Sequence, residues 1–102
     1  MPKKRLTKLS PVHPGEVLRE DFMAPLNLSI NGLARDLHTP PNHVSGIVNE
    51  TRGISARMAL RLARYFGTSA ELWIGLQFDY ELDLARDAVA EQINREVLPR
   101  AS

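Results

Sequence analysis

The chain has 102 residues, of which 43% are hydrophobic, enough for one domain with its own core. It has no cysteine, which excludes disulfides and thiolate chemistry, and no apolar run approaches the roughly 20 residues of a membrane span. We therefore expect a soluble cytoplasmic protein that contacts no membrane. Residues 1–68 hold ten Lys and Arg against five Asp and Glu, and residues 69–102 hold three against seven. The first part favours a polyanion as partner, although ordinary scatter of surface charge would also give these counts.

The chain is expected to begin with a flexible basic arm over residues 1–12, which could contact phosphates or a partner, or simply be solvated. A first helix is predicted from Pro14 to Met23. Proline suits the first position of a helix, and Pro25 cannot continue one. Its expected core residues, at helical spacing, are Val17, Leu18 and Phe22.

The second predicted helix follows Ser29, a residue type that caps helix N-termini. Its apolar residues recur at intervals of three and four, which is typical of a buried helix face. They are Ile30, Leu33, Ala34 and Leu37. The small Ala34 suits a close crossing of two helices. His38 stands where the chain must turn, and histidine tolerates positive φ better than most residues.

The third predicted helix begins at Pro41 and directs Val44, Ile47 and Val48 inward. The residues left on its outer face are small or polar. They are Asn42, His43, Ser45, Gly46 and Asn49. A glycine inside a helix costs about 1 kcal/mol relative to alanine, so Gly46 suggests that something approaches the backbone closely.

Three more helices are predicted in the rest of the chain. The fourth begins after Ser55 and ends at Gly67. The fifth starts with a capping box at residues 68–71, and a separate longer helix runs from about Tyr80 to Leu98. Because no segment alternates like a strand, the predicted fold is all-α with five to six helices.

Residue patterns for catalysis are weak. His13, His38 and His43 are not spaced like metal ligands on one helix. The carboxylates near the first helix are interpreted as a solvated acidic patch. They are Glu16, Glu20 and Asp21. With no nucleophile–base pair or phosphate loop, we expect no enzyme activity, no cofactor and no metal site.

The stretch from Ser29 to Glu50 predicts a helix-turn-helix, a motif in which the second helix enters the DNA major groove. Several features agree: a capped first helix, a small residue at the helix contact, a short turn, and a polar outer face on the second helix. The alternative from these residues alone is a helical hairpin that only builds a core.

Residues 13–77 resemble the HigA/VapI type of antitoxin, within the Cro/repressor-like (XRE) helix-turn-helix proteins. The most diagnostic motifs are His13-Pro14-Gly15-Glu16-Val17-Leu18, Pro40-Pro41-Asn42, Arg52-Gly53-Ile54-Ser55, Arg61-Leu62-Ala63 and Gly67-Thr68-Ser69 through to Trp73. His38 departs from a glycine that is common at this turn. The resemblance covers about two thirds of the chain.

This resemblance implies a type II antitoxin with two linked activities. One is repression of its own operon by binding a double-stranded DNA operator. The other is neutralisation of a cognate HigB-type toxin, a ribonuclease that cleaves mRNA. Two alternatives stay open: a free-standing transcriptional regulator without a toxin, and a helical interaction module that does not bind DNA.

Candidate DNA contacts follow from the chemistry of each side chain. Asn42, His43 and Asn49 are candidates for base edges, since asparagine can pair bidentately with adenine. Thr39 and Ser45 are candidates for phosphate hydrogen bonds. Gly46 permits close approach, and Arg52 is expected to neutralise a phosphate.

The expected division is a DNA-binding domain at 13–77 and a C-terminal helix at 78–102. An apolar stripe on that helix is a candidate homodimer contact, unless it packs on the chain's own core. Its members are Leu82, Ala85, Val89, Ile93 and Val97. Candidate toxin contacts are the arm, the outer face of the first helix and the acidic C-terminal part. Their named side chains are Arg19, Glu20, Asp79, Glu81, Asp83 and Asp87.

Overall fold

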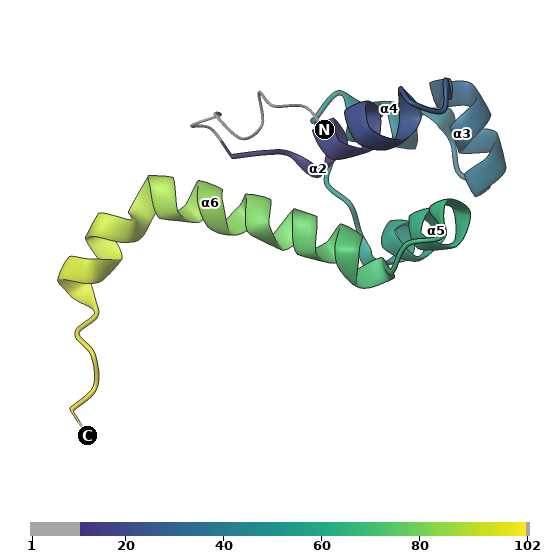
Figure 1. Cartoon of the computed structure of the whole chain (residues 1–102). Coiled ribbons are helices and arrows are strands. Elements are labelled where there is room, and N and C mark those ends of the chain that lie inside the picture. The colour runs from purple at the N-terminus through teal and green to yellow at the C-terminus, as the bar shows by residue number, and fades with distance from the viewer. Residues whose placement is uncertain (1–10, 102) are drawn as a thin grey trace.

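The computed structural model describes residues 11–101, and every regular element in that range is helical. The predicted all-α fold is thus confirmed. The elements are α2 (Pro14–Val17), η1 (Leu18–Met23), α3 (Ile30–Leu37), α4 (Pro41–Val48), α5 (Ala56–Phe66) and α6 (Ala70–Glu96). Most of the predicted basic arm lies outside the described residues. Figure 1 shows α2 to α5 gathered in a bundle from which α6 extends.

Serine side chains cap three of these helices. Ser29 Oγ accepts a hydrogen bond from Gly32 N at 2.9 Å, and Ser55 Oγ accepts one from Met58 N at 3.2 Å, as predicted. At α6 the predicted capping box is displaced by one residue, because Ser69 rather than Thr68 is the N-cap. The Thr68 hydroxyl instead accepts the indole N–H of Trp73 at 2.8 Å.

The first helical segment covers the predicted span, but its second half is π-helical. Ala24 N donates to Arg19 O at 3.0 Å, five residues back, which is the hydrogen bond of a widened turn. All four residues of α2 are buried. The interpretation of Glu16 as part of a solvated patch was wrong, since α2 packs into the bundle and leaves this residue 2% exposed.

The core draws on the bundle and on the start of α6. Its largest fully buried side chains include Leu18, Leu33, Ile47, Leu62 and Trp73. The Trp73 ring lies 4.9 Å from the ring of Phe22, which in turn lies 5.0 Å from that of Phe66. The first turns of α6 are therefore part of the domain core.

The two helices predicted after Ser69 are one continuous helix, α6, which ends at Glu96 rather than at Leu98. No proline stands between Trp73 and Tyr80, so nothing forces a break there. The boundary between 77 and 78 stays a prediction, and α6 passes through it without interruption. Tyr80 still contacts the domain, with its ring 4.8 Å from that of His13.

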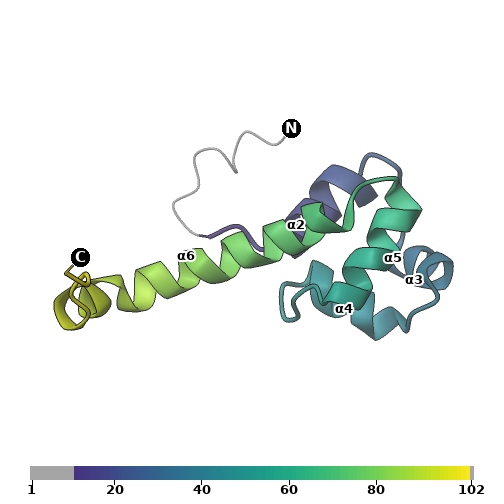
Figure 2. The ribbon, with the colours of Figure 1, turned by 90° about the horizontal axis from the view of Figure 1, so that it is seen from below.

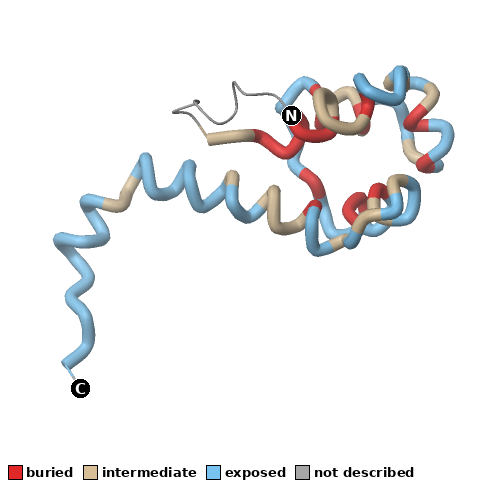
Figure 3. The backbone as a smooth tube through the Cα atoms, viewed as in Figure 1, coloured by how far each residue is buried: buried red, intermediate tan, exposed pale blue. Residues whose placement is uncertain are grey.

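Beyond Tyr80, α6 extends away from the bundle (Figure 2). The radius of gyration is 16.3 Å, whereas a compact chain of this length has about 13 Å. Exposed residues dominate this extended part of α6, which bends toward its C-terminal end (Figure 3). Within residues 11–101, no helix has the length and apolar character that crossing a membrane demands.

Candidate nucleic-acid interface

α3 and α4 form the predicted helix pair, joined by the three residues 38–40. His38 adopts the left-handed conformation, with φ of 56°, so the prediction of positive φ is confirmed. Thr39 N donates to Ala34 O at 3.0 Å, which closes the end of α3. Pro40 is extended, with φ of −61° and ψ of 143°, and so redirects the chain into α4. Ala34 is fully buried, as expected of a small residue at a helix contact.

The predicted inward and outward faces of α4 are both present. Val44, Ile47 and Val48 are buried. Of the predicted outer residues, Asn42 and Asn49 are exposed, whereas His43, Ser45 and Gly46 are half-buried. α4 ends at Val48, so Asn49 is its C-cap and not part of the helix. The Asn49 side-chain amide donates to Ser45 Oγ at 3.2 Å, which orients the amide on this surface.

A shallow hollow of about 400 Å³ lies where α3 and α4 both begin. It is lined by Ser29, Ile30, Asn31, Pro41, Asn42 and Ser45. The predicted DNA contacts include neither Ser29, which is predicted only as an N-cap, nor Asn31. Pro40 and Pro41 have no backbone N–H, so the hollow offers an anion mainly the hydroxyl and amide groups of Ser29, Asn31, Asn42 and Ser45.

His43, Gly46 and Arg52 lie together on one flank of α4. A Cβ atom built at Gly46 would be 3.2 Å from the Cβ atom of Arg52. Burial, and then the nearby Arg52 charge, lower the pKa of His43. The close neighbour that Gly46 was expected to need is therefore present within the chain. Thr39, half-buried, lies apart from them in the turn that precedes α4.

Arginines from elsewhere in the chain hold the C-terminal ends of both helices. The guanidinium group of Arg19 donates to Val48 O at the end of α4 and pairs with Glu50 at 3.3 Å. Arg61 donates to Leu37 O at the end of α3, at 2.8 Å. Such donors satisfy carbonyls that have no partner inside the helix. These contacts join residues 29 and 24 positions apart, so local sequence patterns could not reveal them.

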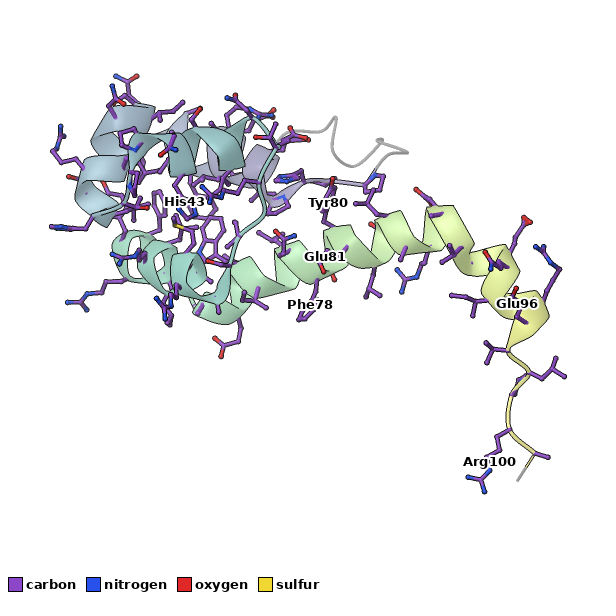
Figure 4. The ribbon with its side chains drawn as sticks, turned by 180° about the vertical axis from the view of Figure 1, so that it is seen from behind. His43, Phe78, Tyr80, Glu81, Glu96 and Arg100 are labelled. Carbon is purple, nitrogen blue, oxygen red and sulfur yellow. The ribbon has the colours of Figure 1, made fainter. Side chains whose placement is uncertain are left out.

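His13 links the start of the domain to α6. Its Nδ1 atom accepts a hydrogen bond from Gly15 N at 2.8 Å, and its ring packs against that of Tyr80 in an edge-to-face arrangement. Figure 4 shows Tyr80 pointing toward the segment before α2, while Phe78 leaves α6 on the opposite side. Burial is the largest influence and lowers the pKa of His13; Glu50 raises it and Arg19 lowers it.

Stability is expected to fall as the pH drops below 6.5, the ordinary pKa of histidine. The folded state holds His13 at a lower pKa, so it binds fewer protons there than the unfolded chain. The contribution is complete above 6.5 and is lost as the pH falls through the folded pKa. Urea unfolding between pH 7.5 and pH 5.5 measures it. His13→Asn keeps a capping oxygen without titrating and should make the curve less steep, leaving the part that comes from His43, whose pKa burial also lowers. An equally steep curve would contradict the assignment.

Among residues 11–101, no group of three His, Cys, Asp or Glu is placed to hold a metal ion.

Comparisons with known proteins agree with this geometry. The helix-turn-helix family profile matches residues 18–73. Virulence-associated protein I of Dichelobacter nodosus is 49% identical over 72% of this chain and 68% of its own length. Antitoxin HigA-1 of Vibrio cholerae is 31% identical over 86% of this chain and 83% of its own length. A solved structure of the Pseudomonas aeruginosa antitoxin HigA with the higBA promoter superposes with a TM-score of 0.87. It is 47% identical and covers 89% of this chain and 99% of that one.

Proposed function

The chain belongs to the helix-turn-helix family, and we propose that it is a type II antitoxin that binds an operator and represses its own operon. The observation that carries the proposal is the exposed polar face of α4, held beside the start of α3. The likeness to an antitoxin solved with promoter DNA supports it. A cytoplasmic location, with the DNA, is part of the proposal.

In this mechanism α4 enters the major groove with its N-terminal half leading. Asn42 and Asn49 face base edges, and the Ser45 hydroxyl holds the Asn49 amide in one orientation. The hollow at the starts of α3 and α4 receives a phosphate, which the Ser45 hydroxyl in its lining can contact, and Thr39 in the turn before α4 contacts phosphate as well. Phosphate contacts fix the position of the protein, and the asparagines supply part of the sequence preference.

The test begins with selection from random duplex DNA by the full-length protein. We expect enrichment of an inverted repeat with half-sites about one helical turn, roughly 34 Å, apart or a multiple of it. Failure to enrich any sequence would refute operator binding.

Asn49→Ala is expected to weaken binding to the selected duplex by about 1–3 kcal/mol, since a bidentate base contact is lost. Binding to unrelated duplex should barely change, because phosphate contacts remain. Competition gel shifts with both duplexes measure the two affinities. An unchanged preference for the selected sequence would show that Asn49 does not contact a base.

A homodimer is the second part of the proposal, because one short recognition helix gives limited affinity and an inverted repeat needs two copies. The apolar stripe of α6 is the proposed contact. Leu82 is 49% exposed, Ile93 48% and Val97 63%, so the alternative that the stripe packs on the chain's own core is wrong. Ala85 and Val89 complete the stripe and help line a hollow of about 260 Å³ with Leu82 and Ile93.

Neutralisation of a cognate HigB-type toxin is the third part, supported by the likeness to proteins named as antitoxins. An RNA-cleaving toxin should present a basic surface, which favours the acidic residues of α6 from Asp79 to Asp87 as its contact. Asp79, Asp83 and Asp87 recur every four residues and are exposed, as is Glu81. The alternative contact, Arg19 and Glu20 on η1, is less suited because Arg19 is already engaged with Val48 and Glu50.

Joint Asp83→Lys and Asp87→Lys substitutions are expected to slow capture of the toxin encoded beside the gene. Association should fall about tenfold at low salt, because charges at the edge of an interface mainly steer encounter. Stopped-flow mixing with purified toxin measures this. For a control with the same change of charge, Asp87→Lys alone is compared with Glu71→Lys, at the bundle end of α6. Equal effects of the two changes on the association rate would refute the extended part of α6 as the toxin contact.

Two alternative functions can be distinguished from an antitoxin by experiment. A free-standing regulator would have no toxin gene beside its own and would bind the operator all the same. A helical interaction module would show no preference among duplexes. The neighbouring reading frame and the selection experiment separate the three.

A further inference from the structure

The loop after the recognition helix folds back onto that helix. Gly46 O accepts three hydrogen bonds from it: from Thr51 N at 2.9 Å, from Arg52 N at 3.1 Å and from Thr51 Oγ1 at 3.2 Å. From the other side, Arg19 pairs with Glu50, which has a φ of 65°. The loop is thus fixed at both faces, and its backbone places Arg52 against α4.

The aliphatic stem of Arg52 lies over Gly46. A Cβ atom at Gly46 would be 3.2 Å from Arg52 Cβ and 3.5 Å from Arg52 Cδ. The arginine stem therefore lies so close that even the methyl group of alanine would require Arg52 to shift by a few tenths of an ångström. Glycine lets the stem lie against α4 without that shift, at a position where alanine would otherwise favour the helix.

The charged end of Arg52 also acts on α4. His43 lies one turn before Gly46, toward the N-terminus of α4, and after burial the Arg52 charge lowers the pKa of that histidine. The stem of Arg52 is therefore packed on the outer surface of α4 at Gly46, and its charge reaches a second residue of the same helix.

We propose that Arg52 is a specificity-determining residue that reads a guanine in the operator, with Gly46 and Thr51 as positioning residues. This rests on the proposed operator binding, and it replaces the expectation that Arg52 only neutralises a phosphate. A side chain packed on the outer surface of the recognition helix enters the groove with that helix. Arginine's planar fork matches the O6 and N7 acceptors of guanine, which the point charge of lysine does not.

The decisive variant is Arg52→Lys, which keeps the charge and removes the fork. Affinity for the selected duplex should fall about tenfold or more, while affinity for unrelated duplex changes less than about twofold. The salt dependence of binding should stay the same, because the number of cationic contacts does not change. Arg64→Lys, an exposed arginine on α5, is the matched control and should change neither affinity.

The base itself is found by replacing each guanine of the selected duplex with 7-deazaguanine, which lacks the N7 acceptor. One position in each half-site should weaken wild-type binding, and the penalty at that position should vanish with Arg52→Lys. Retained sequence preference in Arg52→Lys, with Arg52→Ala weakening both duplexes equally, would overturn the proposal in favour of a phosphate contact. Failure of wild-type protein to select any sequence would instead refute operator binding.

The positioning roles have their own readout. Gly46→Ala should reduce the 7-deazaguanine penalty without lowering the thermal unfolding temperature, because alanine favours the helix while its methyl group displaces Arg52. Thr51→Val should reduce the 7-deazaguanine penalty as well. Thr51→Ser keeps the hydroxyl and should show the same penalty as the wild type. An undiminished penalty in both Gly46→Ala and Thr51→Val would show that neither residue positions Arg52.

Discussion

Val89→Asp combined with Ile93→Asp is expected to yield a monomer whose affinity for the two-half-site duplex falls about hundredfold. The two residues lie in the middle of the α6 stripe and line the same hollow. A carboxylate at each would have to be desolvated in a helix contact, which is costly without a partner. Because two linked reading heads bind far more tightly than one, losing the dimer removes the second head. Binding to a single half-site should be unchanged.

Sedimentation measures the association state, and gel shifts with one or two half-sites measure the affinities. Leu84→Asp is the matched control, since Leu84 is 44% exposed on α6 but lies off the stripe. Circular dichroism checks that α6 keeps its helix in both variants. Dimers that persist in the double variant would place the contact elsewhere on the chain.

The stripe also extends closer to the bundle than its predicted members. Phe78 is 60% exposed and lies four residues before Leu82, on the same side of α6. In Figure 4 it points away from the side on which Tyr80 meets the start of the domain. Sequence reasoning missed it because α6 was divided near this point. In a continuous helix, Phe78 continues the apolar surface toward the domain.

Local sequence patterns predicted those features that depend on a few neighbouring residues. Ser29 and Ser55 cap their helices, His38 takes the left-handed conformation, and the inward residues of α4 are buried. Each follows from spacing or from the chemistry of one residue. The misplaced cap at α6 has the same origin, since Thr68 and Ser69 are both good caps and only the packing of Trp73 decides between them.

Features of the site that depend on distant residues were beyond these patterns. Gln77 accepts the N–H of Ile54 at 2.7 Å and so ties α6 to the loop before α5. Arg19 and Arg61 hold carbonyls that the chain brings close only on folding. Periodicity shows which face of a helix is apolar, and gives no information on which side chain from another element will reach its end. The position of Arg52 across Gly46 belongs to the same class.

Gly15→Ala is expected to destabilise the folded state by about 3 kcal/mol, at the upper end of the cost of forcing extra atoms into a packed core. The added Cβ atom would lie 1.8 Å from Ile47 O, so α2 and α4 would have to separate. Ile47 O is a backbone atom and cannot move aside by changing rotamer. The separation would displace the recognition helix and the buried Ile47 side chain together.

Gly75→Ala is the control for this change, measured by urea unfolding at equal protein concentration. It lies inside α6 with nothing within 4 Å of an added Cβ atom, so alanine should stabilise the helix by up to about 1 kcal/mol. The same substitution should thus have opposite signs at the two positions, which separates a steric cost from a general effect of losing glycine. Faster amide exchange in α4 than in α5 should accompany Gly15→Ala if the strain is transmitted through Ile47. Unfolding free energies that agree between Gly15→Ala and the wild type would show that α2 can withdraw from α4 at no cost. The position of the recognition helix would then depend on its buried core residues and on the contact of Arg19 with Val48 O rather than on α2.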